Sequence, residues 1–269
     1  MLVVMFPAYN ESEAMRPLLE RIAATFKLIP GPKSVLVVDD GSTDGTASTA
    51  EGKARELGLS LQVAAHGTNR GLGEALRTGF LRAHEILGGD GVLVAMDADN
   101  THDPALIPAM LAKLEDGFDV VIASRYAPGG KEIGLSPLRR LMSRGASLML
   151  AVFLPVRGAR DYSCGYRAYR GSVIAEAFEV YGDNFVVESG FVASAEILIK
   201  LGGLPARVGE VPLVLRYDLK GGASKMRVGQ TIGRYFLLMA AGRRALARRT
   251  RSVATRPIAS TPGRTKGVS

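Results

Sequence analysis

The sequence predicts an α/β fold in which a mostly parallel sheet carries helices on both faces. Two observations lead to this prediction. Over the first 125 residues, short apolar runs typical of buried strands alternate with segments of helical periodicity. Three of the apolar runs end in polar or acidic clusters. Because the carboxyl ends of parallel strands meet at one edge of a sheet, these clusters are expected to form one site.

The first half of the chain supplies the regular part of the pattern. Apolar runs predict strands at residues 2–6, 34–38, 61–65, 92–96 and 119–123. Helical spacing predicts helices at residues 12–26, from about 46 to 57, from 71 to about 87, and from 104 onward. In the first of these helices, Met15, Leu18, Leu19, Ile22 and Phe26 share one side.

The second half is less regular. Residues 126–137 read as a glycine-rich loop, 138–154 as an apolar helix, 160–170 as mixed, 187–201 as a helix, 207–215 as a strand, 216–225 as a loop and 228–249 as an amphipathic helix. Beyond Thr250 the composition predicts disorder. We therefore expect one domain over residues 1–241, with halves 1–125 and 126–241, and a tail over 242–269.

Composition limits the possible classes of protein. The 269 residues are 47% hydrophobic and 22% charged, which is typical of a globular domain. A single cysteine, Cys164, excludes an internal disulfide framework and any multi-cysteine metal site, and it favours a reducing, cytosolic compartment. Residues 2–6 are too short for a signal peptide, and no run of 18 apolar residues predicts a membrane span.

The net charge of +8 is concentrated at the end of the chain. Residues 242–269 hold eight Arg and Lys and no acidic residue, so the rest of the chain has 26 basic and 26 acidic residues. Such a tail is compatible with anionic lipid, with nucleic acid, or with a merely solubilising role. It has no aromatic residues between its arginines, which disfavours single-stranded nucleic acid.

The predicted strand at 92–96 stops at two carboxylates, Asp97 and Asp99. Side chains at i and i+2 of an extended segment point the same way, so both can face one site. Hard oxygen ligands of this kind suit Mg²⁺ or Mn²⁺. The alternative is a polar loop that opens a helix, with Asp103 as the cap and Pro104 in the first turn.

The segments that follow three other predicted strands, those at 2–6, 34–38 and 119–123, add complementary groups. Pro7, Tyr9 and Glu11 offer an aromatic plane and a carboxylate suited to a nucleobase, and Asp40 offers an acceptor for the base or the ribose. Arg125 offers a cation for phosphate. Taken singly, Tyr9 is equally compatible with packing and Arg125 with a surface charge.

Several other nucleotide and catalytic motifs are missing. The sequence has no GxxxxGK[ST], no dinucleotide-binding glycine fingerprint, no GxSxG elbow and no histidine pair with zinc-site spacing. P-loop nucleotide hydrolases are thereby excluded, and a dinucleotide-dependent oxidoreductase is disfavoured. A nucleotide-binding or basic-tail nucleic-acid protein without catalysis stays as an alternative of another class, but it leaves Asp97 and Asp99 unused.

The motifs FPAYNE, VVDDGSTDGT, MDADNTHDP, ASRY and SCGYRAYR resemble those of family-2 glycosyltransferases, above all the dolichyl- and polyprenyl-phosphate mannose synthases. The resemblance covers about residues 3–232. It implies a GT-A fold, a nucleotide-sugar donor (GDP-mannose, with UDP-glucose as the alternative), a divalent metal, Mg²⁺ or Mn²⁺, at the DxD motif, and a polyprenyl or dolichyl monophosphate acceptor. A polysaccharide or a small metabolite is the alternative acceptor.

The resemblance also implies roles for individual residues. The nucleotide sugar is expected to contact Pro7, Tyr9, Glu11, Val38, Asp40, Asp97, Ala98 and Asp99. Asp97 and Asp99 would hold the metal, and Asp99, Arg125 and Lys225 are the catalytic candidates. Candidates for the acceptor phosphate are Arg139, Arg144, Arg216, Ser224 and Lys225. Thr101 stands where prokaryotic relatives often carry a glutamine ligand.

This assignment implies a reaction without a protein base, because a monophosphate is already charged near neutral pH. We expect an inverting displacement at the anomeric carbon. The expected location is cytoplasmic, peripheral at the cytoplasmic face of the membrane, with a membrane-anchoring partner protein conceivable and no nucleic acid bound. The helix expected at 228–249 suits either the lipid interface or packing on the core.

Overall fold

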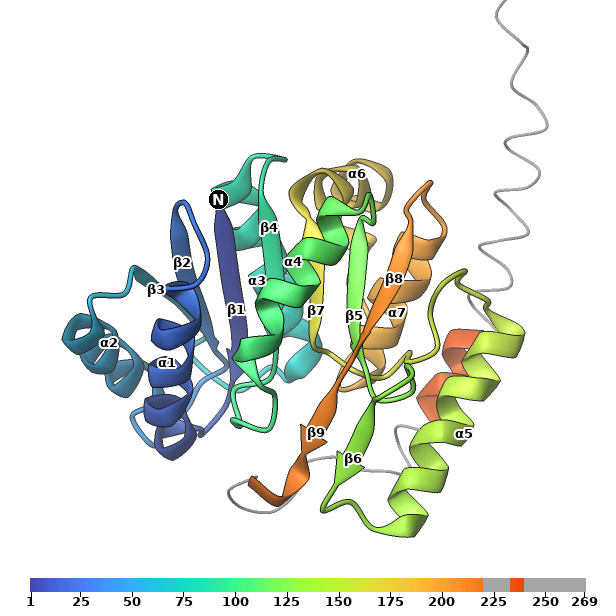
Figure 1. Cartoon of the computed structure of the whole chain (residues 1–269), viewed down its shortest axis with the longest axis horizontal. Coiled ribbons are helices and arrows are strands. Elements are labelled where there is room, and N and C mark those ends of the chain that lie inside the picture. Colours follow the sequence, from blue (N-terminus) through green and yellow to red (C-terminus); the bar gives the residue numbers. More distant parts are fainter. Residues whose placement is uncertain (220–232, 240–269) are drawn as a thin grey trace, which may run out of the picture.

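The computed structural model describes residues 1–219 and 233–239. Its strands are β1 (Leu2–Ala8), β2 (Lys33–Asp39), β3 (Leu61–Ala65), β4 (Val92–Ala95), β5 (Val120–Ser124), β6 (Lys131–Ile133), β7 (Arg167–Arg170), β8 (Val208–Pro212) and β9 (Val214–Arg216). Seven of them form one sheet in the order β3-β2-β1-β4-β7-β5-β8, and β6 pairs with β9 in a small separate sheet (Figure 1). All pairs in the large sheet except those of β7 are parallel, which confirms the predicted fold class.

Helices cover both faces of the large sheet. They are α1 (Ser12–Phe26), α2 (Thr46–Leu57), α3 (Leu72–Leu87), α4 (Ile107–Glu115), α5 (Pro137–Phe153), α6 (Gly171–Tyr181) and α7 (Val192–Gly202), with 3₁₀ turns at Pro104–Leu106, Gly182–Asn184 and Tyr217–Leu219. In Figure 1, α1 and α4 lie in front of the sheet, while α3 and α7 lie behind it. Helix α5 stands beside the small sheet, apart from the two helical layers.

The core forms because the central strands are apolar on both faces. Val3, Val4 and Met5 of β1 are fully buried, as expected for a strand covered by helices on both sides. Helix α1 buries the side predicted from its spacing, including Met15 and Leu18. Behind the sheet, Phe80 of α3 meets the ring of Tyr169 edge to face at 5.1 Å, a favourable geometry for aromatic pairs.

Strand β7 departs from the predicted pattern. It lies antiparallel between β4 and β5, within the segment that was expected to be mixed. Its sequence, RAYR, looks like a surface segment, yet Arg167 is fully buried. The Arg167 guanidinium donates to the carbonyl oxygens of Ser194 and Tyr162, which makes the burial of its charge possible.

Other boundaries also differ from the prediction. The strand expected at 207–215 is two strands, of which β9 leaves the large sheet and pairs with β6, inside the predicted glycine-rich loop. The helix expected at 187–201 begins only at Val192, and α6 was not predicted. Residues 233–239 are helical, whereas the rest of the helix expected at 228–249 and the tail at 242–269 lie outside the described residues. Within the described part, no helix is long and apolar enough to cross a membrane.

Candidate functional site

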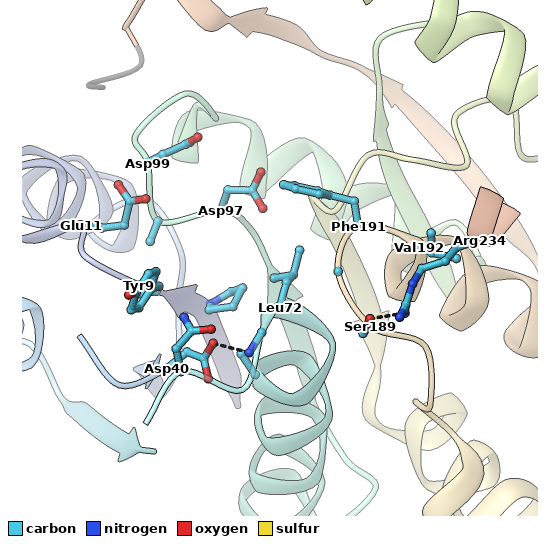
Figure 2. Close-up of a pocket in the computed structure, with 17 residues that line it drawn as sticks. Tyr9, Glu11, Asp40, Leu72, Asp97, Asp99, Ser189, Phe191, Val192 and Arg234 are labelled. Atoms are coloured by element: carbon cyan, nitrogen blue, oxygen red, sulfur yellow. Dashed lines mark hydrogen bonds between the residues drawn. The ribbon is translucent and has the colours of Figure 1, made fainter. Parts of the chain in front are cut away.

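Three strand ends meet at one pocket of about 550 Å³, a size typical of small-molecule sites (Figure 2). The chain after β1 contributes Tyr9 and Glu11, the end of β2 contributes Asp40, and the chain after β4 contributes Asp97 and Asp99. Asparagines in the left-handed region turn the chain after two of these strands, Asn10 with φ of 51° and Asn100 with φ of 60°. Asparagine tolerates this conformation better than most residues, so both turns suit their sequence.

The structure brings together seven of the eight residues expected to contact a nucleotide sugar. Pro7, Tyr9, Glu11, Asp40, Asp97, Ala98 and Asp99 all line the pocket. Val38 does not, because its side chain is fully buried in the sheet. The sequence signal for Val38 was its place in a motif, which does not distinguish a core side chain from a contacting one.

Asp40 lines the pocket and is held in place by the protein, with only 4% of its side chain exposed. Its Oδ1 accepts from the backbone N–H of Arg70 at 2.9 Å and lies 2.7 Å from Nδ1 of His66, and its Oδ2 accepts from the N–H of Gly71 at 2.7 Å. Nε2 of His66 lies in turn 2.9 Å from Oγ1 of Thr78 on α3. This chain of contacts holds the segment from 66 to 71 in place, so that Asn69 and Gly71 line the pocket.

The two carboxylates after β4 have different surroundings. Asp99 is buried, and its Oδ1 accepts from the hydroxyl of Thr101 at 2.6 Å and from the Thr101 N–H at 3.2 Å. Thr101 therefore acts on Asp99 through two hydrogen bonds. The backbone N–H of Asp97 donates to Nδ1 of His102 at 3.3 Å. Asp103 accepts from the N–H of Ala105 and caps the following 3₁₀ turn, as the alternative interpretation of this segment expects.

This donor set fits a divalent metal of the Mg²⁺ type. Asp97 and Asp99 offer hard carboxylate oxygens at the wall of the pocket. Within the described residues, no group of three or more His, Cys, Asp or Glu side chains is arranged to hold a metal ion. Two carboxylates leave the other positions of an octahedral shell to water and to substrate phosphate, which is the usual coordination of Mg²⁺ beside a nucleotide.

Arg125 is not brought to the pocket. Its Nε and Nη2 donate to the two carboxylate oxygens of Asp161 at 2.7 Å each, and Nη2 also donates to the Ser163 hydroxyl. Burial opposes the charge of Arg125, but the field of Asp161 outweighs it and raises the pKa of the guanidinium. Burial likewise opposes ionisation of Asp161, yet Arg125 holds the pKa of that carboxyl below its usual 3.8. Arg125 and Asp161 thus form a buried ion pair outside the lining of this pocket.

Two of the other predicted cations, Arg144 and Arg216, also lie away from the pocket lining. Arg144 lies over the ring of Tyr126 at 5.7 Å, and Arg216 donates to Asp218 at 2.7 Å. The side chain of Arg139 lies outside the described part of the chain, as do Ser224 and Lys225. Of the acceptor-phosphate candidates whose side chains the structure describes, Arg144 and Arg216, neither lines this pocket.

The opposite wall of the pocket comes from residues that sequence reasoning missed. Ser189, Gly190, Phe191 and Val192 precede or begin α7, and Arg234 reaches the pocket from the helical segment 233–239 (Figure 2). The backbone of this wall lies close to the start of α3. A Cβ added to Gly73 would stand 2.1 Å from the carbonyl oxygen of Glu188, so only glycine fits there. The glycine of the Gly71-Leu72-Gly73 run was the one available signal.

This chain is similar to known proteins over most of its length. Residues 3–178 match the family described as Glycosyl transferase family 2. Undecaprenyl-phosphate mannosyltransferase of Micrococcus luteus is 34% identical over 228 residues, which cover 84% of this chain and 88% of that protein. Dolichol-phosphate mannosyltransferase of Pyrococcus furiosus is 35% identical over 235 residues, 86% of this chain but only 60% of the relative. Polyprenol monophosphomannose synthase of Mycolicibacterium smegmatis is 36% identical over 176 residues, 64% of this chain and 62% of the relative.

Solved structures share the fold. Glucosyl-3-phosphoglycerate synthase from Mycobacterium tuberculosis, in complex with Mn²⁺, UDP and phosphoglyceric acid, aligns with a TM-score of 0.60 at 21% identity. The alignment covers 90% of this chain and 76% of that one. The same enzyme with Mg²⁺ and UDP aligns equally well, with a TM-score of 0.60 at 20% identity over 89% of this chain and 79% of that one. At this identity the likeness confirms the GT-A-like fold and nothing finer.

Proposed function

Because the chain belongs to glycosyl transferase family 2, we propose that it moves mannose from GDP-mannose onto a polyprenyl or dolichyl monophosphate. The observation that carries the proposal is the meeting of Tyr9, Glu11, Asp40, Asp97 and Asp99 in one pocket. Relatives named as mannosyltransferases of undecaprenyl, dolichyl and polyprenyl phosphates support the choice of sugar and acceptor.

The first half of the chain would bind the donor. Tyr9 and Glu11 are proposed to contact the base, and the fixed carboxylate of Asp40 to accept from the base or the ribose. Asp97 and Asp99 are proposed to hold Mg²⁺ or Mn²⁺ against the diphosphate, with Ala98 between them. A bound divalent ion would stabilise the charge of the departing nucleoside diphosphate. Thr101 keeps the Asp99 carboxylate oriented toward that task.

The reaction is proposed as a direct inverting displacement. An acceptor phosphate oxygen forms a bond to the anomeric carbon, while the bond from that carbon to the donor β-phosphate oxygen breaks and its electron pair leaves with the nucleoside diphosphate. A monophosphate carries about −1.5 to −2 charges near neutral pH, so no protein base is required. Arg139, Arg144, Arg216, Ser224 and Lys225 are proposed to hold this phosphate. Arg125, enclosed with Asp161, is assigned to the framework of the acceptor half.

A lipid acceptor requires access to a membrane surface. Helix α5 exposes Leu138, Leu141, Leu148 and Val152, which lie on one side of the helix at helical spacing. Arg144 lies on the same helix and supplies positive charge for anionic headgroups. We propose peripheral contact through α5, at the cytoplasmic face of the membrane, with or without an anchoring partner protein.

Transfer of radiolabelled sugar into organic-extractable polyprenyl phosphate tests the proposal. GDP-mannose and UDP-glucose are compared as donors, each with Mg²⁺, Mn²⁺ or a chelator. We expect lipid label from GDP-mannose that disappears with the chelator. Label from UDP-glucose alone would overturn the choice of donor, and metal-dependent binding of a nucleotide sugar without lipid label would overturn the choice of acceptor.

A further inference from the structure

The pocket has an uneven distribution of charge. Among its described lining residues are four carboxylates, those of Glu11, Asp40, Asp97 and Asp99. Arg234 is the single Arg or Lys among these lining residues. Figure 2 shows Asp97 and Asp99 on one wall and Arg234 on the other. An anionic substrate in this pocket therefore meets one fixed guanidinium on the wall opposite the carboxylates.

The position of Arg234 is fixed by its helix. Tyr235, Leu238 and Met239, which follow it in the helical segment, are buried. The Nη1 group of Arg234 donates to the hydroxyl of Ser189 and lies 3.7 Å from Oε2 of Glu188. These contacts direct the guanidinium toward the wall that continues into Phe191 and Val192 (Figure 2).

The ion pair alone does not explain why a guanidinium stands at this place. The Arg234 side chain is 46% exposed and that of Glu188 is 23% exposed, and pairs with this much solvent contribute little to stability. A guanidinium presents five N–H donors in a planar fork, so it can hold Ser189 and a second acceptor at the same time. Phosphate oxygens are the acceptors that this fork matches best.

We propose that Arg234 binds a phosphate oxygen of the substrate in this pocket. The proposal rests on the transferase function proposed above, in which the donor diphosphate and the acceptor monophosphate are the two sources of such an oxygen. Asp97 and Asp99, with their metal, would neutralise the phosphate from one wall and Arg234 from the other. Arg234 thereby joins the site from the C-terminal part of the chain, beyond residues 3–178 that match the family.

Binding of GDP and of guanosine, each with Mn²⁺, tests the proposal on the full chain. We expect Arg234→Ala to weaken GDP binding by about ten- to a hundredfold, the usual range for a lost charge-assisted hydrogen bond, and to leave guanosine binding unchanged. The GDP affinity of Arg234→Lys should lie between those of wild type and Arg234→Ala, because lysine keeps the positive charge but lacks the planar fork of N–H donors. Arg82→Ala is the matched control, since Arg82 is an exposed arginine of α3 that pairs with Glu85.

Measurement of the KM for polyprenyl phosphate then distinguishes the acceptor phosphate from the donor diphosphate. If GDP binding is unchanged in Arg234→Ala and this KM rises about tenfold or more, the phosphate is that of the acceptor. If GDP and guanosine lose affinity equally, Arg234 only holds the wall and the proposal is wrong. Unchanged GDP affinity together with unchanged KM would also overturn it. A wild-type protein that binds neither GDP nor UDP would overturn the proposed function itself.

Discussion

At the scale of single residues, Thr101 influences the site through its neighbour. Its hydroxyl and its N–H both donate to Oδ1 of Asp99, which fixes the carboxylate that we propose as a metal ligand. Groups that orient a ligand in this way typically change metal affinity by about 10- to 100-fold when they are removed. The residue is therefore expected to tune metal binding without touching the metal.

We predict that Thr101→Val weakens Mn²⁺ binding by about 10- to 100-fold and that Thr101→Ser, which keeps the hydroxyl, restores it. Direct titration of Mn²⁺ in the presence of GDP measures the effect. Asp99→Asn should abolish metal-dependent transfer with the fold intact, as judged by circular dichroism. Equal Mn²⁺ affinity in wild type and Thr101→Val would contradict the prediction.

The Asp161–Arg125 pair gives a prediction for stability. Removal of one partner from a buried pair leaves an uncompensated charge, so Asp161→Asn should lower the free energy of unfolding by about 3–5 kcal/mol at pH 7. Because the pKa of Asp161 is lower in the folded state than its usual 3.8, its contribution is complete above that value and is lost as the pH falls through the folded pKa.

Urea unfolding of wild type and Asp161→Asn at pH 7 and at decreasing pH checks this sign. The gap between the two proteins should narrow below pH 3.8, as the wild-type carboxyl becomes protonated. A constant gap over this range would show that charge is not the cause.

The residue types in the motifs predicted which side chains line the pocket, but they did not predict the partners of those side chains. Asp40 was expected to be an acceptor for substrate, but its partners His66, Arg70 and Gly71 are 26 to 31 positions away along the chain. Arg125 was expected to face phosphate, and its partner Asp161 is 36 positions away. A strand-end motif contains no information about such distant partners, so local sequence could not distinguish a free charge from a paired one.

At the scale of elements, the contact between α3 and the segment before α7 shapes the pocket. Gly73 of α3 lies against the backbone of Glu188 and Ser189, where a Cβ would come within 2.1 and 2.8 Å of backbone atoms. Backbone cannot yield as a flexible side chain does, so a larger residue must push the two elements apart.

We predict that Gly73→Ala lowers the free energy of unfolding by about 1–3 kcal/mol and weakens GDP binding, because it displaces the wall formed by residues 189–192. Calorimetric unfolding and GDP titration measure both effects. Gly52→Ala in α2 is the control, since a Cβ there meets nothing within 4 Å and should raise stability by up to about 1 kcal/mol. If the two variants behave alike, the close approach is unimportant.

The elements themselves were predictable where periodicity is strong. Strands β1, β2 and β4 each contain an apolar run of at least four residues, and α1 has a clear apolar side, so both patterns were readable. Strand β7 was not, because its four residues include two arginines and its burial depends on carbonyl partners elsewhere in the fold. The wall before α7 was missed for a similar reason: its place in the pocket is set by packing on α3.

At the scale of the whole molecule, the exposed apolar side of α5 is the surface that we propose for contact with the membrane that holds a lipid acceptor. Leu141 is 70% exposed and Leu148 is 67% exposed. Residues 1–241 carry equal numbers of basic and acidic side chains, so the net positive charge comes from the tail beyond them. Apolar contact and electrostatic attraction are therefore separable by mutation.

We predict that Leu141→Ser combined with Leu148→Ser lowers binding to anionic vesicles about tenfold or more, without loss of stability, because both side chains are already in water. Flotation measures the binding. Leu28→Ser is the matched control, since Leu28 is 73% exposed just beyond α1. Deletion of residues 242–269 tests the tail separately, and unchanged binding in the double serine variant would exclude α5 as the contact.

The antiparallel strand β7 has a consequence for the order in which the chain folds during synthesis. Within the described residues, the partners of strand β5 are β7 and β8, so none of them is available until residues 167–170 have left the ribosome. Until then β4 also presents an open edge beside β1, and such edges invite association with other chains. A fragment ending at Arg125 would keep most donor-binding residues but lack the strand that completes its sheet. Nascent chains of about this length should therefore depend on chaperones more than the finished protein does.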